Sequence, residues 1–206
     1  VLLYLSDILD MEDLKNFRQI DSRTPGHPEI ETPGVDANTG PLGQGVGMGV
    51  GMAVAETMLQ RDKKHYTYIL AGDGDLQEGI SSESASLAGT LGLGKLIYIY
   101  DSNGISIDGS NDLAFTENVA ERFKSYNWHV IENINGNDIK SIQNAIEISK
   151  NEISKPSLII ADTTIGFGSP NKAGSESAHG EPLGEEETSL TRDNLGWDYG
   201  EFEVPE

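Results

Sequence analysis

Two short motifs near the middle of the chain carry side chains that could bind a metal ion. Gly72-Asp73-Gly74 follows an apolar run, and Asn103 follows a second apolar run thirty residues after Asp73. A carboxylate and a side-chain amide are hard oxygen ligands, and Mg²⁺ completes such a partial set with water and phosphate oxygens. The two glycines let the backbone come close to a bound group. These residues therefore predict a site for a metal-bound diphosphate.

The elements that would position these motifs have the sequence pattern of a βαβ unit. The runs 66–71 and 96–100 are short, apolar and rich in β-branched and aromatic residues, as in buried strands. Residues 79–91 between them are expected to form the helical crossover that parallel strands require. Both strands then end at the same edge of the sheet, where open parallel sheets bind their ligands. We therefore expect Asp73 and Asn103 to face one site.

The alternation of strands and helices continues to residue 161. It predicts an α/β fold with a doubly wound, mainly parallel sheet and helices on both faces. Asp162-Thr163-Thr164 follows the last expected strand and should lie at the same sheet edge as Asp73 and Asn103. Besides the elements above, we expect helices at 11–17, 41–60, 117–126 and 137–151 and strands at 128–134 and 156–161.

The expected helix at 41–60 contains an unusual number of glycines. Gly43, Gly47 and Gly51 recur at every fourth position and so lie on one face, with two further glycines beside it. Each glycine in a helix interior costs about 1 kcal/mol relative to alanine. We therefore expect a compensating close approach by a neighbouring helix or by a ligand, and the residues alone favour neither.

Length and composition predict one domain. The 206 residues, of which 36% are hydrophobic and 24 are glycine, suit a soluble α/β protein rich in tight turns. We expect a single domain over 1–206 with a core at about 41–165, followed by a lid and extended tail at 166–206. The apolar stretch 1–5 is expected to be the buried end of a helix whose start is absent, so the chain is expected to be part of a longer polypeptide.

The charge balance and the cysteine count narrow the possible partners. With 34 acidic and 14 basic residues the net charge is −20, which disfavours binding to nucleic acid or to anionic membranes. The absence of cysteine excludes disulfides, thiolate metal ligands and a cysteine nucleophile, and it is compatible with a reducing compartment. We expect a cytoplasmic protein with no nucleic-acid partner and no membrane partner.

The longer sequence around these motifs resembles that of transketolase, a thiamine diphosphate enzyme. Four motifs come in that family's order along nearly the whole chain, which is a far more specific signal than Gly-Asp-Gly alone. The resemblance implies the thiamine diphosphate-binding fold. The motifs are Thr24-Pro25-Gly26-His27-Pro28-Glu29, Gly40-Pro41-Leu42-Gly43-Gln44-Gly45, the stretch 72–83 with Asn103, and the stretch 163–174 with His179-Gly180 after it.

The resemblance implies a cofactor, a metal ion and the residues that hold them. The cofactor is thiamine diphosphate, bound together with Mg²⁺ or Ca²⁺. The side chains of Asp73 and Asn103 and the carbonyl of Ile105 are the implied metal ligands. The implied cofactor-binding residues are Gly40, Leu42, Gly72, Asp73, Gly74, Glu78, Asn103 and His179.

Three residues have an implied catalytic part. By resemblance, His27 lies beside the cofactor and helps proton transfer and substrate binding, and His179 contacts the diphosphate and the reacting centre. Glu78 belongs by resemblance to a carboxylate network across a dimer interface. From the residues alone, ordinary positions in polar loops are favoured for both histidines, and a helix-dipole partner is as good an interpretation of Glu78 as a functional residue.

The resemblance implies a transferase of the pentose phosphate pathway. Transketolase moves a two-carbon ketol unit from a ketose phosphate to an aldose phosphate, so sugar phosphates are the implied substrates. The chain looks like the N-terminal cofactor-binding part without the pyrimidine-binding domain. We expect it to be inactive alone and to act as a homodimer or with a complementary pyrimidine-domain subunit.

Two other functions stay open at this point. The chain could be a non-catalytic module that binds metal and diphosphate or only assembles with a partner. It could also be a component of another thiamine diphosphate enzyme. Such enzymes share Gly-Asp-Gly and the later Asn, but membership of that group explains the stretches 40–45 and 163–174 poorly. Restored ketol transfer on addition of the pyrimidine-binding domain would favour the transketolase component over the module.

Overall fold

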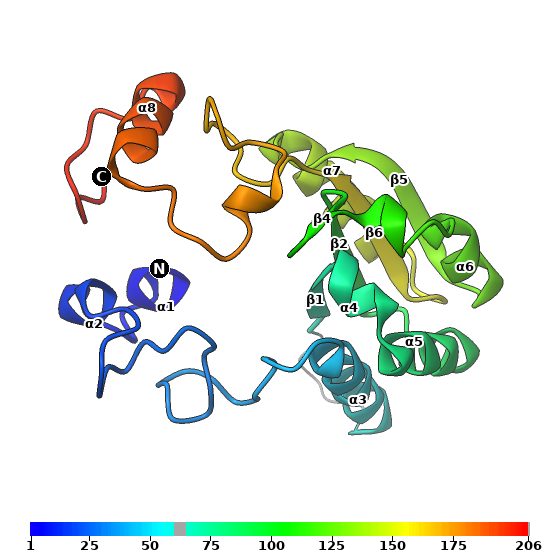
Figure 1. Cartoon of the computed structure of the whole chain (residues 1–206). Helices are drawn as coiled ribbons and strands as arrows, with labels where there is room; N and C mark the ends of the chain where they lie inside the picture. Colours follow the sequence, from blue (N-terminus) through cyan, green and yellow to red (C-terminus); the bar gives the residue numbers. More distant parts are fainter. Residues whose placement is uncertain (60–64, 206) are drawn as a thin grey trace.

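A four-stranded parallel sheet lies in the right-hand part of the molecule as Figure 1 shows it, with the N-terminal and C-terminal segments on the left. The computed structural model describes residues 1–59 and 65–205. Neighbouring strands in the order β1-β2-β6-β5 all pair in parallel. The four expected strands are confirmed, with bounds that differ by no more than two residues. They are β1 (Thr67–Gly72), β2 (Leu96–Ser102), β5 (His129–Asn135) and β6 (Ser157–Asp162).

Helices cover both faces of the sheet, as the doubly wound pattern predicts. On one face α3 (Gln44–Leu59), α5 (Gly79–Leu91) and α6 (Val119–Ser125) share the larger apolar core with β1 and β2. On the other face α7 (Ile139–Asn151) packs through Ala145. The expected α/β fold is therefore confirmed.

Aromatic side chains fill the larger core between β2, α5 and α6. Tyr98, Phe123 and Trp128 are buried, and the rings of Tyr98 and Trp128 meet edge to face with centroids 4.6 Å apart. Each such ring pair adds about 0.5–1.5 kcal/mol to the stabilisation from burial. The indole Nε1 of Trp128 donates to the carbonyl of Ala85 at 2.8 Å, which satisfies its only polar group. This contact holds α5 in place above the sheet.

Helix α3 begins at Gln44, later than expected, because the residue before it cannot be helical. Gly43 has a φ of +75°, in the left-handed region that an α-helix excludes. The stretch from Pro41 to Gly43 is therefore a loop that leads into the helix. Gln60, the expected end of this helix, lies outside the described residues.

The glycines of this segment make room for side chains of β1 and α5. A Cβ at Gly49 would lie 2.2 Å from a side-chain atom of β1, and a Cβ at Gly43 or Gly47 would lie 2.8 Å or 3.2 Å from Ile80 of α5. A Cβ at Gly51 would meet no described atom within 4 Å. The expected contact is therefore confirmed for Gly43 and Gly47, and for Gly51, where no described residue supplies it, the contact stays a prediction.

The N-terminal segment forms two short helices, α1 (Leu2–Leu5) and α2 (Met11–Lys15). Asp10 caps α2, since its Oδ1 accepts from Asp13 N at 3.0 Å and Asp13 Oδ2 accepts from Asp10 N at 3.1 Å. The expectation that the stretch 1–5 is buried is wrong for the described residues, because none of them is buried and Leu2 is 80% exposed.

The C-terminal part of the chain folds back beside α1 and α2, so that both termini lie on the same side of the molecule (Figure 1). The expected lid and tail at 166–206 contains η2 (Glu176–Ala178) and α8 (Glu185–Leu195). In the described part of the chain, no helix is both long and apolar enough to cross a membrane. The remaining short elements are α4 (Asp73–Gln77), β3 (Ile105–Ser106), β4 (Gly109–Ser110) and η1 (Asn111–Leu113).

Candidate functional site

The carboxyl ends of β1, β2 and β6 meet at one edge of the sheet. The strand register pairs Gly72 with Asp101, and Ser102 with Asp162. Beyond the strands, Thr163 N donates to the carbonyl of Ser102 at 3.2 Å, and the Thr163 hydroxyl donates to Asp101 Oδ1. The predicted convergence of the three strand ends is therefore confirmed.

The Asp73 carboxylate is buried at this edge and held through both oxygens. Asp73 is 6% exposed, and its Oδ1 accepts a hydrogen bond from the Tyr100 hydroxyl. Its Oδ2 accepts from Gly104 N at 3.2 Å. Burial, and secondarily the bond to Asp73, raises the pKa of the Tyr100 phenol above its ordinary value, so the phenol stays a proton donor at neutral pH. Each carboxylate oxygen still has a lone pair for a cation.

A tight turn after β2 presents the next two proposed metal ligands beside Asp73. Asn103 Oδ1 accepts from Ile105 N at 2.9 Å, and Gly104 between them has a φ of +72°. Ile105 then pairs with Ser110 in the short β3–β4 hairpin. Because Gly104 N also binds Asp73, the turn is fixed next to the carboxylate. Asp73, Asn103 and the Ile105 backbone therefore share one neighbourhood.

Asp75, which sequence reasoning missed, joins the Gly-Asp-Gly turn to the loop before α3. Its Oδ2 accepts from Gly72 N at 2.9 Å, and its Oδ1 accepts from Gly43 N at 3.0 Å. The signal in the sequence was an acidic residue at the third position of α4, where a carboxylate can cap the helix. The turn and the loop also lie close at a second point, where a Cβ at Gly74 would lie 3.4 Å from a methyl carbon of Leu42. The Gly-Asp-Gly turn and the loop that contains Gly40 and Leu42 thus form one surface.

His27 and Glu78 lie against opposite ends of that loop. A Cβ at Gly40 would lie 3.4 Å from His27 Cβ and Nδ1, and a Cβ at Gly43 would lie 2.8 Å from Glu78 Cβ. Both side chains are exposed, and Glu78 stands between α4 and α5. The structure therefore brings His27, the Gly40–Gly43 loop, the Gly-Asp-Gly turn and Glu78 into one continuous region.

His179 follows η2 on the long loop after β6. A Cβ at Gly166 would lie 2.8 Å from Ala178 Cβ, so η2 packs directly on the start of this loop. The Nδ1 atom of His179 is buried and has no hydrogen-bond partner among the described residues. A buried polar atom without a partner costs about 1–3 kcal/mol. A bound polar group would remove that cost.

The donor set is suited to a cation that arrives with a phosphate. The described residues include no group of three or more His, Cys, Asp and Glu side chains that could hold a metal ion by themselves. Asp73, Asn103 and the Ile105 carbonyl offer one carboxylate and two neutral oxygens. Mg²⁺ prefers six oxygens and often takes several from water and substrate phosphates. These residues therefore fit a metal ion bound together with a diphosphate.

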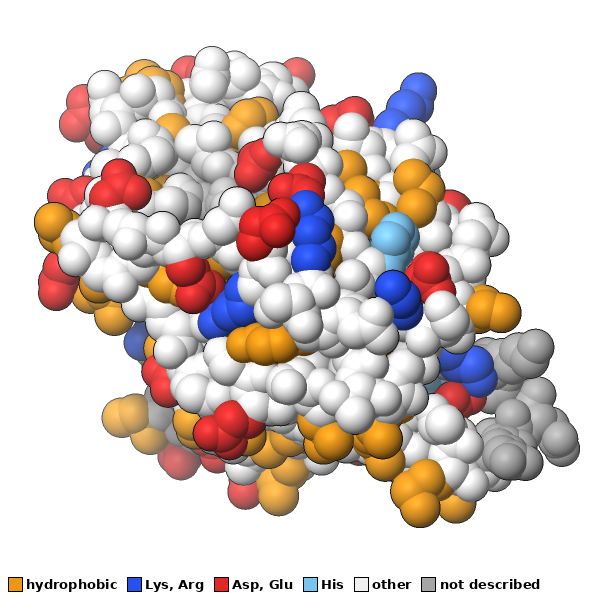
Figure 2. Space-filling view, turned by 90° about the vertical axis from the view of Figure 1, so that its right-hand side faces the viewer, with side chains coloured by type: hydrophobic (Ala, Val, Ile, Leu, Met, Phe, Trp, Pro, Cys, Tyr) orange, Lys and Arg blue, Asp and Glu red, His pale blue; other side chains and the backbone are white. Residues whose placement is uncertain are grey.

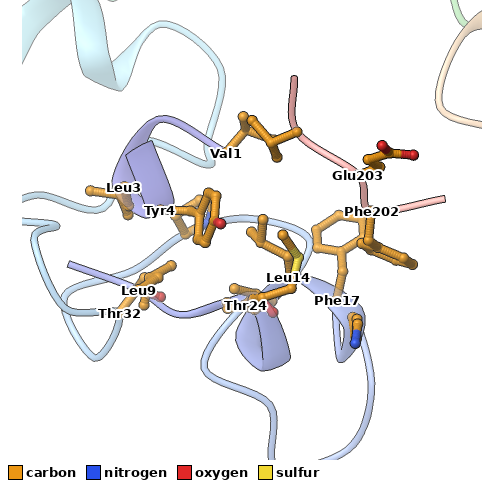
Figure 3. Close-up of a pocket in the computed structure, with 15 residues that line it drawn as sticks. Val1, Leu3, Tyr4, Leu9, Leu14, Phe17, Thr24, Thr32, Phe202 and Glu203 are labelled. Carbon is orange, nitrogen blue, oxygen red and sulfur yellow. The ribbon is translucent and has the colours of Figure 1, made fainter. Parts of the chain in front are cut away.

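An apolar cavity lies elsewhere, between the N-terminal helices and the C-terminal segment (Figure 3). It measures about 680 Å³, and Tyr4, Leu14 and Phe17 point into it together with Phe202 from the C-terminal segment. Thr24, three residues before His27, also lines it. The cavity thus adjoins the loop that carries His27, and none of the proposed metal ligands lines it.

Comparison with known proteins gives one consistent result. The family described as "Transketolase, thiamine diphosphate binding domain" matches residues 1–206. Transketolase 2 of Escherichia coli (strain K12) is 56% identical over 214 aligned residues, which cover 99% of this chain and 32% of that protein. Transketolase of Bacillus subtilis (strain 168) is 55% identical over 215 residues, which cover 99% of this chain and 32% of that protein. The chain spans about a third of the length of these curated relatives.

Solved structures agree with this result. The transketolase from Leishmania mexicana superposes with a TM-score of 0.92 at 48% identity, over 96% of this chain and 31% of that one. The transketolase from Campylobacter jejuni superposes with a TM-score of 0.91 at 50% identity, over 96% of this chain and 32% of that one. The fold of the chain is therefore that of the corresponding third of these proteins.

Proposed function

Because the chain belongs to the transketolase family, whose thiamine diphosphate binding domain it matches throughout, we propose that it is the cofactor-binding part of a ketol transferase. The complete enzyme would move a two-carbon ketol unit from a ketose phosphate to an aldose phosphate. Residues 1–206 would form a single domain, with its core at about 41–165 and a lid at 166–206. Alone, without the pyrimidine-binding part of the cofactor site, the chain would not turn over substrate.

One observation carries this proposal: the buried Asp73 carboxylate lies beside the Asn103–Ile105 turn at the carboxyl edge of the sheet. Asp73, Asn103 and the Ile105 carbonyl would hold Mg²⁺ or Ca²⁺. Two hydrogen bonds, from the Tyr100 hydroxyl and from Gly104 N, orient Asp73 for this. The metal would bind the diphosphate oxygens and neutralise their charge in a protein of net charge −20.

The surrounding residues would bind the cofactor and handle protons. Thiamine diphosphate, when bound, supplies the electron sink for cleavage of the carbon–carbon bond. Gly40, Leu42, Gly72 and Gly74 would let the backbone approach the diphosphate. His179 would donate to the diphosphate through its unpartnered ring nitrogen, and the exposed His27 would contact sugar hydroxyls and transfer protons.

The α3–α5 surface supports the proposal that the protein acts as a dimer. Apolar side chains gather along the lower edge of Figure 2, the level at which α3 and α5 lie in Figure 1. Exposed Glu78 opens α5 at one end of this surface, as a carboxylate shared across a dimer interface requires. A homodimer or a complementary pyrimidine-domain subunit in the cytoplasm would cover it. The exposed apolar residues of this surface include Met48, Met52, Ile80, Leu87 and Leu91.

Calorimetric titration of thiamine diphosphate with and without Mg²⁺ tests the site. The protein at its full natural length should bind the cofactor only with the metal, and Asp73→Asn should abolish that binding. Asp108→Asn removes the same charge from an exposed position of the β3–β4 hairpin and should leave binding unchanged. Equal binding by the wild type and Asp73→Asn would refute the proposed metal site. Binding without ketol transfer in the full-length protein would instead favour a non-catalytic module.

A further inference from the structure

A buried carboxylate on α8 fastens this helix to the loop that follows β6. Glu187 is 7% exposed, and its Oε1 accepts from the Ser169 hydroxyl and from Asn171 N, the latter at 2.8 Å. Its Oε2 accepts from Asn171 Nδ2 at 2.8 Å. Ser169 Oγ in turn accepts from Lys172 N at 3.1 Å. One carboxylate therefore organises the whole turn from Ser169 to Lys172.

The other end of α8 is fastened to the same loop. Asn194 Nδ2 donates to the carbonyl of Gly168 at 2.9 Å. Gly168 has a φ of +91°, and a Cβ there would lie 2.7 Å from Leu195, so the loop backbone lies directly against the helix. We call these contacts of Glu187 and Asn194 the α8 clamp. They make α8 a support of the loop in addition to any role as a lid.

The clamped loop carries His179. Gly174 N donates to the carbonyl of Ile165 at 2.8 Å, and Lys172 Nζ donates to the carbonyl of Leu183 at 2.9 Å. These two bonds close the loop on both sides of η2 and set the path of the backbone through His179. Lys172 is the last residue of the turn that Glu187 organises. The position of the imidazole thus depends on a turn that is fixed from α8.

The charge of Glu187 is essential to this arrangement. All three groups that face its oxygens are hydrogen-bond donors: a hydroxyl, a backbone N–H and a side-chain amide. These donors, the Ser169 hydroxyl first, lower the pKa of Glu187 from 4.5 to about 2. A glutamine of the same shape keeps one acceptor oxygen and turns an N–H group toward the Asn171 amide, which must then flip to present its own oxygen. A glutamine would therefore replace charge-assisted hydrogen bonds by weaker neutral ones without changing the volume.

We propose that Glu187 is a positioning residue for His179: it acts on the cofactor site through the 169–172 turn and touches neither cofactor nor substrate. The inference rests on the proposed function in one respect, that His179 binds the diphosphate. The simpler alternative is that Glu187 only stabilises the first turn of α8. In that case Glu187→Gln would change hydrogen exchange in the loop and cofactor affinity only as far as it lowers the overall stability.

The first test needs no cofactor. Hydrogen exchange is measured at residues 166–179 in Glu187→Gln and in the matched control Glu186→Gln, an exposed neighbour in the same helical turn. At a temperature well below unfolding, we expect at least tenfold faster exchange in this loop for Glu187→Gln and unchanged exchange for the control. If the exchange rates of this loop in Glu187→Gln equal those of the wild type, the inference is overturned.

The second test asks whether Glu187 acts through His179. The affinity for thiamine diphosphate with Mg²⁺ is measured in the full-length protein for Glu187→Gln, His179→Ala and the double variant. We expect a loss of about tenfold for Glu187→Gln in the wild-type background and no further loss in the His179→Ala background. Equal losses in both backgrounds would overturn the inference. If the wild type binds no cofactor, the proposed function fails, and the exchange experiment alone decides the role of the clamp.

Discussion

The hydroxyl of Tyr100 on β2 donates a hydrogen bond to Oδ1 of Asp73, which lies 27 positions earlier in the chain and directly follows the neighbouring parallel strand β1. Tyr100 is only 4% exposed, so water does not compete for this bond. The contact fixes which way the carboxylate faces before any cation arrives. Tyr100 therefore prepares the proposed metal ligand.

Tyr100→Phe should weaken metal binding while leaving the fold intact. Partners of metal ligands typically contribute tenfold to 100-fold to metal affinity, so we expect a loss of about that size in Mg²⁺ affinity. Titration with Mg²⁺ in the presence of saturating thiamine diphosphate measures it. Tyr68→Phe removes a hydroxyl from a half-exposed ring on β1 and should have no effect. Equal Mg²⁺ affinity in wild type and Tyr100→Phe would refute this role.

Gly43→Ala should destabilise the protein and distort the loop at the cofactor site. The left-handed φ of +75° costs an alanine about 1 kcal/mol or more, and the new Cβ would lie 2.8 Å from Glu78 Cβ. Urea denaturation measures the change in the free energy of unfolding. Gly51→Ala is the matched control for the chain as a monomer: no described atom lies within 4 Å of its Cβ, so we expect a stabilisation of about 0.5–1 kcal/mol there. Destabilisation of equal size in both variants would contradict the packing described above.

Asp75→Asn should separate the Gly40–Gly43 loop from the Gly-Asp-Gly turn. An amide cannot accept from both Gly43 N and Gly72 N in the present geometry, so one backbone N–H loses its partner. Such a loss costs about 1–3 kcal/mol of stability. We also expect weaker binding of thiamine diphosphate, because the loop would no longer be held against the turn. Unchanged stability together with unchanged cofactor affinity would show that Asp75 is dispensable.

The α8 clamp should make stability depend on pH in the acidic range. The folded-state pKa of Glu187 is lowered from 4.5 to about 2, so its stabilising contribution is complete above pH 4.5 and is lost as the pH falls toward 2. Thermal unfolding followed between pH 2 and pH 7 measures this. Glu187→Gln should be less stable than the wild type at neutral pH, and the difference should shrink as the pH falls. A difference that stays constant over this range would contradict the assignment.

Much of the fold and part of the candidate site could be predicted from the sequence. The strands and the long helices follow from local periodicity, and the meeting of Asp73 with the Asn103 turn follows from the geometry of a βαβ unit. Local sequence patterns predicted the first and last residues of helices and strands less well. Helix α3 begins at Gln44 because of the backbone conformation of Gly43, which composition did not reveal.

By itself, the sequence determined which residue types stand at the carboxyl edge of the sheet, because alternation of strands and crossovers leaves parallel strands only one common edge. The tertiary structure alone decided which groups hold the polar residues there. Tyr100 meets Asp73, Asp75 meets Gly43 and Glu187 meets Ser169 across gaps of 27, 32 and 18 residues. Such contacts depend on strand register, loop path and the packing of helices on the sheet. Periodicity indicates which face of an element is buried, but it does not indicate which side chain that face will contact.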